Sequence, residues 1–168
     1  MKYTPYTEHE IKSMNLMDEG IYKFQVMDVI LNDKNGNQLQ DKNGNDMAKL
    51  KLMVWDKESR EHIIYTFISG DGNFAYKLRH YADTLGMVLD YEDGTFNIMR
   101  TIGKNGLASV IIKKGTTKAD GSGELWPDRN DVKDFVVETH SPFERPKEIT
   151  PSDTSSQSET SLDDDVPF

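Results

Sequence analysis

Three segments of this chain alternate apolar and polar residues with a period of two, and this pattern constrains the fold most strongly. They are residues 20–30 (GIYKFQVMDVI), 47–56 (MAKLKLMVWD) and 62–69 (HIIYTFIS). Successive side chains of a β-strand point to opposite faces, so each segment predicts a strand with one buried face. The first buries Tyr22, Phe24 and Val26, and the second buries Ala48, Leu50, Leu52 and Val54.

The segments between these strands carry turn and helix patterns. Residues 8–16 predict a short helix within a lead-in of residues 1–18. Residues 31–46 contain DKNGN twice, and Asn-Gly favours tight turns, which predicts an extended hairpin. A calcium loop is the weaker alternative, because the glycine comes too early and no glutamate closes the loop.

Residues 73–86 (NFAYKLRHYADTLG) predict a helix that residues 71–73 cap and Gly86 ends. Lys77 and Arg79 are expected on its solvated face. The expected buried face consists of Phe74, Leu78, Tyr81, Ala82 and Leu85.

Residues 95–102 and 107–114 predict two more strands, joined by a turn at 103–106, and residues 125–137 close the body. The order is then three strands, one helix and two strands. This is the element order of the OB-fold, a mostly β, partly open barrel of five strands. We therefore expect an OB-like domain over residues 19–140, with an extended hairpin after the first strand.

Composition excludes several classes of protein. The 168 residues include no cysteine, which excludes disulfide scaffolds, thiolate zinc sites and thiol nucleophiles. No apolar run is long enough to span a membrane, and residues 1–10 lack the apolar core of a secretory signal. These features predict a cytoplasmic protein without membrane contact.

The net charge of −9 is unevenly distributed. Residues 141–168 hold seven acidic and two basic residues, so more than half of the negative charge lies in this segment. It is rich in Ser and Thr and has no apolar period, which predicts a disordered acidic tail. We divide the tail into a linker, 141–162, and a tip, 163–168.

The tip consists of Asp163, Asp164, Asp165, Val166, Pro167 and Phe168. It resembles the tail tip of bacterial and phage single-stranded DNA-binding proteins. Segments of the body, such as GIYKF and IGKNGLASVIIKK, look like phage-type members of the same family. The resemblance implies single-stranded DNA binding in replication, recombination and repair, with a tip that docks onto the proteins of these processes. In a bacteriophage-encoded protein, this function would be carried out in the bacterial cytoplasm.

The residues themselves indicate where DNA would bind. Single strands bind where basic groups follow the backbone and aromatic rings stack on bases. Lys49, Lys51 and Trp55 share the predicted outer face of the second strand. Tyr65 and Phe67 share a face with Ile63, so stacking on bases and core packing both remain open for them. A basic cluster is expected around the last hairpin, formed by Arg100, Lys104, Lys113 and Lys114. Trp126, which follows a glycine-rich loop, is a further candidate for stacking.

Two other functions are alternatives. The chain could be an interaction protein that does not bind DNA and uses the tip to occupy host repair proteins. A metal-dependent nuclease is disfavoured, because the four histidines lack metal-ligand spacing and Asp90, Glu92 and Asp93 flank an expected turn at Gly94. We therefore expect a protein that is not an enzyme and has no catalytic residues, metal or cofactor. A homo-oligomer is compatible with the sequence.

Overall fold

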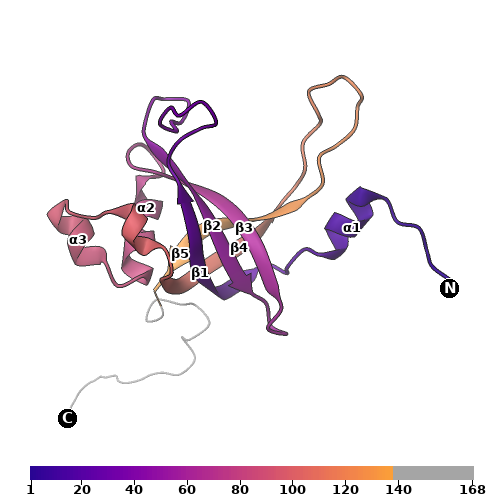
Figure 1. The fold of residues 1–168 in the computed structure, drawn as a ribbon, viewed down its shortest axis with the longest axis horizontal. Coiled ribbons are helices and arrows are strands. Elements are labelled where there is room, and N and C mark those ends of the chain that lie inside the picture. The colour runs from indigo at the N-terminus through magenta and orange to yellow at the C-terminus, as the bar shows by residue number, and fades with distance from the viewer. Residues whose placement is uncertain (138–168) are drawn as a thin grey trace, which may run out of the picture. The chain divides into compact units, whose positions relative to one another are not determined.

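Five antiparallel strands form one sheet in the described part of the chain. The structure, a computed structural model, describes residues 1–137. The strands are β1 (Gly20–Ile30), β2 (Met47–Trp55), β3 (Glu61–Ser69), β4 (Asn105–Lys113) and β5 (Arg129–Val136). Their order is β3-β2-β1-β4-β5, and the two edge strands β3 and β5 approach each other (Figure 1). This mostly β, OB-like arrangement confirms the predicted fold class.

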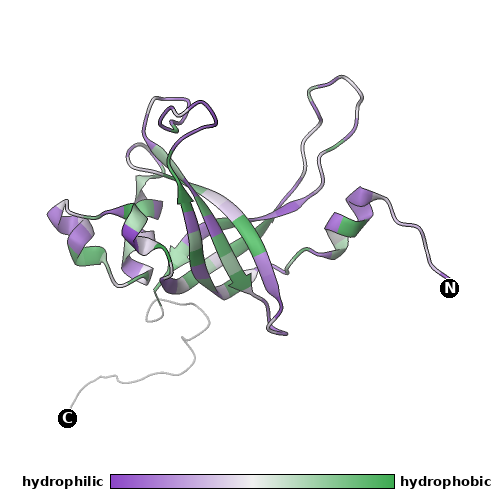
Figure 2. Cartoon of the chain, in the orientation of Figure 1, coloured by the Kyte–Doolittle hydropathy of each residue, from purple (hydrophilic) through white to green (hydrophobic). Residues whose placement is uncertain are grey.

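The first two strands bury the faces that their alternation predicts. Phe24 and Val26 of β1 and Leu50 of β2 are fully buried, and hydrophobic residues concentrate in the strands (Figure 2). The register between β1 and β2 shifts between Val26 and Asp28. A bulge adds one residue to one strand, so the inward position moves from Asp28 to Val29, which is buried.

The β1–β2 loop contains the same turn twice. The carboxylate of Asp33 accepts hydrogen bonds from the backbone N–H groups of Asn35 and Asn37, and Asp41 repeats this pattern in the second copy. Gly36 has a φ of +84°, which a side chain would disfavour. Because the loop's own N–H groups occupy both carboxylates, turn chemistry explains the repeat.

Helix α1 (Glu8–Met14) matches its prediction, whereas α2 (Ala75–Thr84) differs at its start. No side chain caps α2, and its N-cap residue is Phe74. The predicted core position of Phe74 is wrong: its side chain is exposed, because it precedes the first helical turn. Lys77 is half-buried rather than solvated. Gly86 follows the helix with a φ of +76°, as expected of a helix end.

The predicted strand at 95–102 is wrong. Its second half forms a 3₁₀ helix, η1 (Ile98–Thr101), which follows the short helix α3 (Val88–Asp93). The side chain of Asn97 accepts a hydrogen bond from the N–H of Met99, and the Thr101 hydroxyl donates to the carbonyl of Ile98. Such local bonds satisfy the backbone without a partner strand, which explains why the apolar run does not join the sheet.

The fifth strand is instead β5, from the closing segment. Val132 and Phe135 are its buried apolar residues, and the ring of Phe135 packs edge-on against Phe24 and Tyr81, at 5.4 and 4.9 Å between ring centroids. The ladder between β4 and β5 shifts register between Ser109 and Val110. The two inward residues of β5 are therefore three positions apart, and the strand shows no period of two.

None of the helices within residues 1–137 has the length and apolar character needed to cross a membrane. The predicted linker 141–162 and tip 163–168 lie outside the described residues.

Candidate functional site

The outer face of β2 and β3 carries lysines opposite aromatic residues. In the ladder between these strands, Lys49 lies opposite Phe67 and Lys51 lies opposite Tyr65. Tyr65 and Phe67 are 45% and 49% exposed, and Ile63 on the same face is similarly exposed. The core face of β3 is filled by Ile64, Thr66 and Ile68 instead. This settles the question that alternation left open, because both rings face outward.

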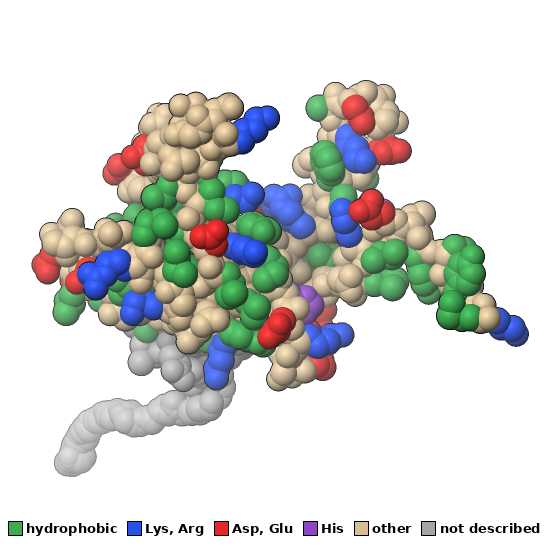
Figure 3. Space-filling view, viewed as in Figure 1, with side chains coloured by type: hydrophobic (Ala, Val, Ile, Leu, Met, Phe, Trp, Pro, Cys, Tyr) green, Lys and Arg blue, Asp and Glu red, His purple; other side chains and the backbone are tan. Residues whose placement is uncertain are grey.

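The ammonium group of Lys49 lies over the exposed rings. Its Nζ atom is 4.8 Å from the ring centroid of Tyr65 and 5.9 Å from that of Phe67, within the range of a cation–π interaction. Lys51 and Trp55 occupy half-buried positions on the same face of β2. Figure 3 shows basic and hydrophobic side chains side by side over the central strands. This face therefore offers flat aromatic surfaces next to positive charge.

A groove of about 740 Å³ runs along this face. One wall is the outer face of β3, and the other is the start of β5 with the loop before it. The N-terminal segment also contributes to the lining of the groove. Its lining includes Lys12, Asn15, Leu16, Lys49, His62, Ile63, Tyr65, Phe67, Trp126, Pro127, Asp128, Arg129, Asn130 and Asp131.

Trp126 is presented by the β4–β5 loop. Its side chain is 54% exposed, and the Nζ atom of Lys118 lies 4.9 Å from the ring centroid. The backbone N–H of Trp126 donates to the carbonyl of Thr116, which aligns the two arms of the loop. A Cβ atom at Gly115 would overlap the carbonyl group of Trp126, so this close approach requires glycine. The tryptophan is thus held at the groove by its backbone, with its ring accessible.

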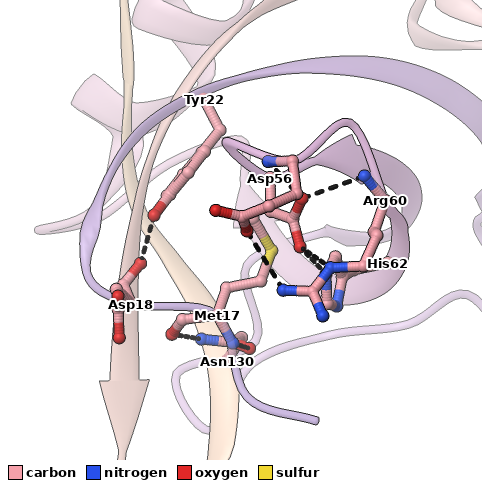
Figure 4. Close-up of polar contacts among 8 residues, drawn as sticks. Met17, Asp18, Tyr22, Asp56, Arg60, His62 and Asn130 are labelled. Atoms are coloured by element: carbon pink, nitrogen blue, oxygen red, sulfur yellow. Dashed lines mark hydrogen bonds and ion pairs between the residues drawn. The ribbon is translucent and has the colours of Figure 1, made fainter.

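The N-terminal segment is fixed beside β5 by Met17. Its backbone N–H donates to Oδ1 of Asn130 at 2.8 Å, and its carbonyl accepts from Nδ2 of Asn130 at 3.0 Å (Figure 4). The Met17 side chain is buried in the core. This anchor brings Lys12, Asn15 and Leu16 to the groove, where sequence reasoning did not place them. No local pattern indicates the contact, because it joins residues 113 positions apart.

The turn between β2 and β3 positions His62 at one end of the groove. Asp56 accepts hydrogen bonds from the backbone N–H groups of Glu58 and Arg60 and contacts Nε2 of His62 at 2.8 Å (Figure 4). Burial alone would raise the pKa of Asp56, but these hydrogen bonds and the Arg60 guanidinium lower that pKa to about 2. Asp56 is therefore a carboxylate that holds the turn closed.

The predicted basic cluster is divided between two places. Lys113 ends β4 and Lys114 begins the β4–β5 loop, and they pair with Asp131 and Asp128 of the groove. Arg100 lies instead in η1 and Lys104 directly precedes β4, at the other end of that strand, and neither residue lines the groove. The prediction that Arg100 and Lys104 cluster with Lys113 and Lys114 is wrong, because residues 95–102 do not form a strand of the last hairpin.

The acidic residues near Gly94 also differ from expectation. Asp90, Glu92 and Asp93 lie in helix α3 rather than a turn, and Gly94 ends that helix with a φ of +75°. Glu92 forms an ion pair with Arg79 at 2.7 Å. Within residues 1–137, no group of three or more His, Asp or Glu side chains is arranged to hold a metal ion.

Comparison with protein-family models and with curated proteins finds no match for this chain. Exposed rings, nearby ammonium groups and an open channel suit a ligand with flat, stackable groups and repeated negative charge.

Proposed function

We propose that this chain is a non-enzymatic single-stranded DNA-binding protein whose groove binds DNA with little sequence preference. The observation that carries the proposal is the pair of exposed rings on β3, Tyr65 and Phe67, with the ammonium of Lys49 over them. Each base stacked on an aromatic side chain contributes about 1–3 kcal/mol, and every base has a face that can stack. Rings of this kind therefore give affinity without selecting a sequence.

The charges of the groove support the same proposal. Asp128 and Asp131 would repel phosphates, but each is paired with a lysine at 3.3 Å. Among the described residues, neither Lys49 nor Arg129 has an ion-pair partner, and both line the groove. The negative net charge of the whole chain therefore does not describe the charge of this surface.

The proposal is tested by titrating the protein with oligo-thymidine while following tryptophan fluorescence. Binding should quench the signal of exposed Trp126, and duplex DNA of equal length should compete weakly. The logarithm of the affinity should fall with the logarithm of salt concentration, with a slope of about 0.7 for each phosphate contact. An absence of binding at low salt would leave the interaction-protein alternative, and cleavage of the oligonucleotide on adding Mg²⁺ would favour a nuclease.

We also propose that residues 163–168 recruit replication, recombination or repair proteins. The support is the sequence itself: three carboxylates that suit a basic surface, then Val166, Pro167 and an aromatic Phe168 that suits a hydrophobic pocket. Proteins captured from a bacterial extract by the wild-type chain and by Phe168→Ala should be identified by mass spectrometry. Recovery of the same replication and repair proteins by both would contradict this part of the proposal.

A further inference from the structure

The two walls of the groove belong to strands that do not pair with each other. Within residues 1–137, β3 pairs with β2 and β5 pairs with β4, so β3 and β5 are the edges of the sheet. They nevertheless lie close together and line opposite sides of the groove. Their separation is therefore not fixed by a backbone ladder, and other contacts must set it.

Lys77 joins the two edges. This residue comes from α2, and its Nζ atom donates a hydrogen bond to Oγ1 of Thr66 in β3 at 2.9 Å. The same atom donates to the carbonyl of Val132 in β5 at 2.8 Å. Thr66 and Val132 are both buried. One ammonium group thus holds an acceptor from each edge strand.

The surroundings of Lys77 favour this fixed geometry. Burial lowers the pKa of its ammonium group, the carboxylates of Asp131 and Asp134 oppose that effect, and Lys113 adds to it. A buried ammonium is costly unless its protons are hydrogen-bonded, so the side chain is held to its two acceptors. Long, flexible lysine side chains at the surface have no such constraint.

Both acceptors of the bridge are neighbours in sequence of residues that line the groove. Thr66 stands between Tyr65 and Phe67 in β3, so a movement of Thr66 moves both exposed rings. Val132 follows Asp131, which lines the opposite wall. We infer that Lys77 is a positioning residue, which sets the spacing of the β3 and β5 walls and thereby the affinity for single-stranded DNA without touching the DNA.

This inference rests on the proposed function, and Lys77→Met tests it. Methionine keeps an unbranched chain of similar length and removes the ammonium group. We expect the dissociation constant for oligo-thymidine to rise about 2- to 30-fold, the range typical of residues that act on a site from outside it. The slope of affinity against salt should stay at the wild-type value, because no phosphate contact is lost.

A matched control is Lys49→Met, the same substitution inside the groove. It should reduce the salt slope by about 0.7, as expected for the loss of one phosphate contact. A second control, Val29→Ala, destabilises the core beneath β1 and leaves the bridge intact. It should bind oligo-thymidine with wild-type affinity under conditions in which circular dichroism shows that the variant is folded. This result would separate a general loss of stability from a change in the groove.

Thr66→Val provides a second test if Lys77→Met does not fold. It removes one acceptor with little change in shape, and it should also weaken binding at an unchanged salt slope. Wild-type protein that fails to bind DNA would overturn the proposed function. If wild type binds and the folded variants of Lys77 and Thr66 bind equally well, only the positioning role is overturned. A salt slope that falls in Lys77→Met as in Lys49→Met would also overturn it, by indicating direct phosphate contact.

Discussion

Replacing Tyr65 with alanine should weaken DNA binding more than it weakens the fold. The ring is 45% exposed on the outer face of β3, so its removal empties no core site. Its contact with the Nζ atom of Lys49 is solvent-exposed and contributes about 0.5–1 kcal/mol. One stacked base, by contrast, contributes about 1–3 kcal/mol to binding. The dissociation constant should therefore rise about 5- to 150-fold.

The matched control is Tyr76→Ala. Tyr76 is exposed to the same extent, 46%, but lies on α2 and does not line the groove. Fluorescence anisotropy of labelled oligo-thymidine at fixed salt should give wild-type affinity for Tyr76→Ala. Tyr65→Phe keeps the ring and should also bind normally. Equal losses in Tyr65→Ala and Tyr76→Ala, or no loss in either, would refute the assignment of the stacking surface to β3.

Two further predictions concern the loops around the groove. Gly115→Ala should weaken oligo-thymidine binding and shift the fluorescence emission of Trp126, because the new Cβ atom would overlap the carbonyl of Trp126. Unchanged binding and emission would contradict this prediction. The pKa of Asp56 is about 2, below its usual 3.8, so its carboxylate stabilises the fold above about pH 4, and that contribution should disappear as the pH falls towards 2. Denaturant unfolding of wild type and Asp56→Asn should differ at pH 5 and converge at low pH, and a constant difference would contradict the assignment.

Local periodicity was sufficient to predict β1, β2 and β3 and the outward face of Lys49. In β2 and in β1 up to Val26, burial follows the alternation of the sequence, whereas the alternation of β3 did not decide which of its faces is buried. It was not sufficient for β5, where a register shift separates inward Val132 and Phe135 by three positions. It was also misleading at 95–102, where Asn97 and Thr101 satisfy the backbone locally.

The groove was predictable only in part, for a related reason. Lys49, Tyr65 and Phe67 come from adjacent strands, so the pattern of those strands brings them together. Lys12 and Arg129 reach the same groove from opposite ends of the described chain. Their meeting depends on long-range contacts such as that between Met17 and Asn130, and a single sequence does not reveal such pairs.

The contact between Met17 and Asn130 also has a consequence for synthesis of the chain on the ribosome. β1 lies in the middle of the sheet, yet its neighbour β4 and the partner of the N-terminal segment, in β5, are translated much later. A nascent chain that ends before residue 130 cannot close this contact, and its exposed β1 edge would be open to pairing with other chains. Folding of this unit should therefore wait until β5 is available, with a late, cooperative step that completes the sheet and the groove together.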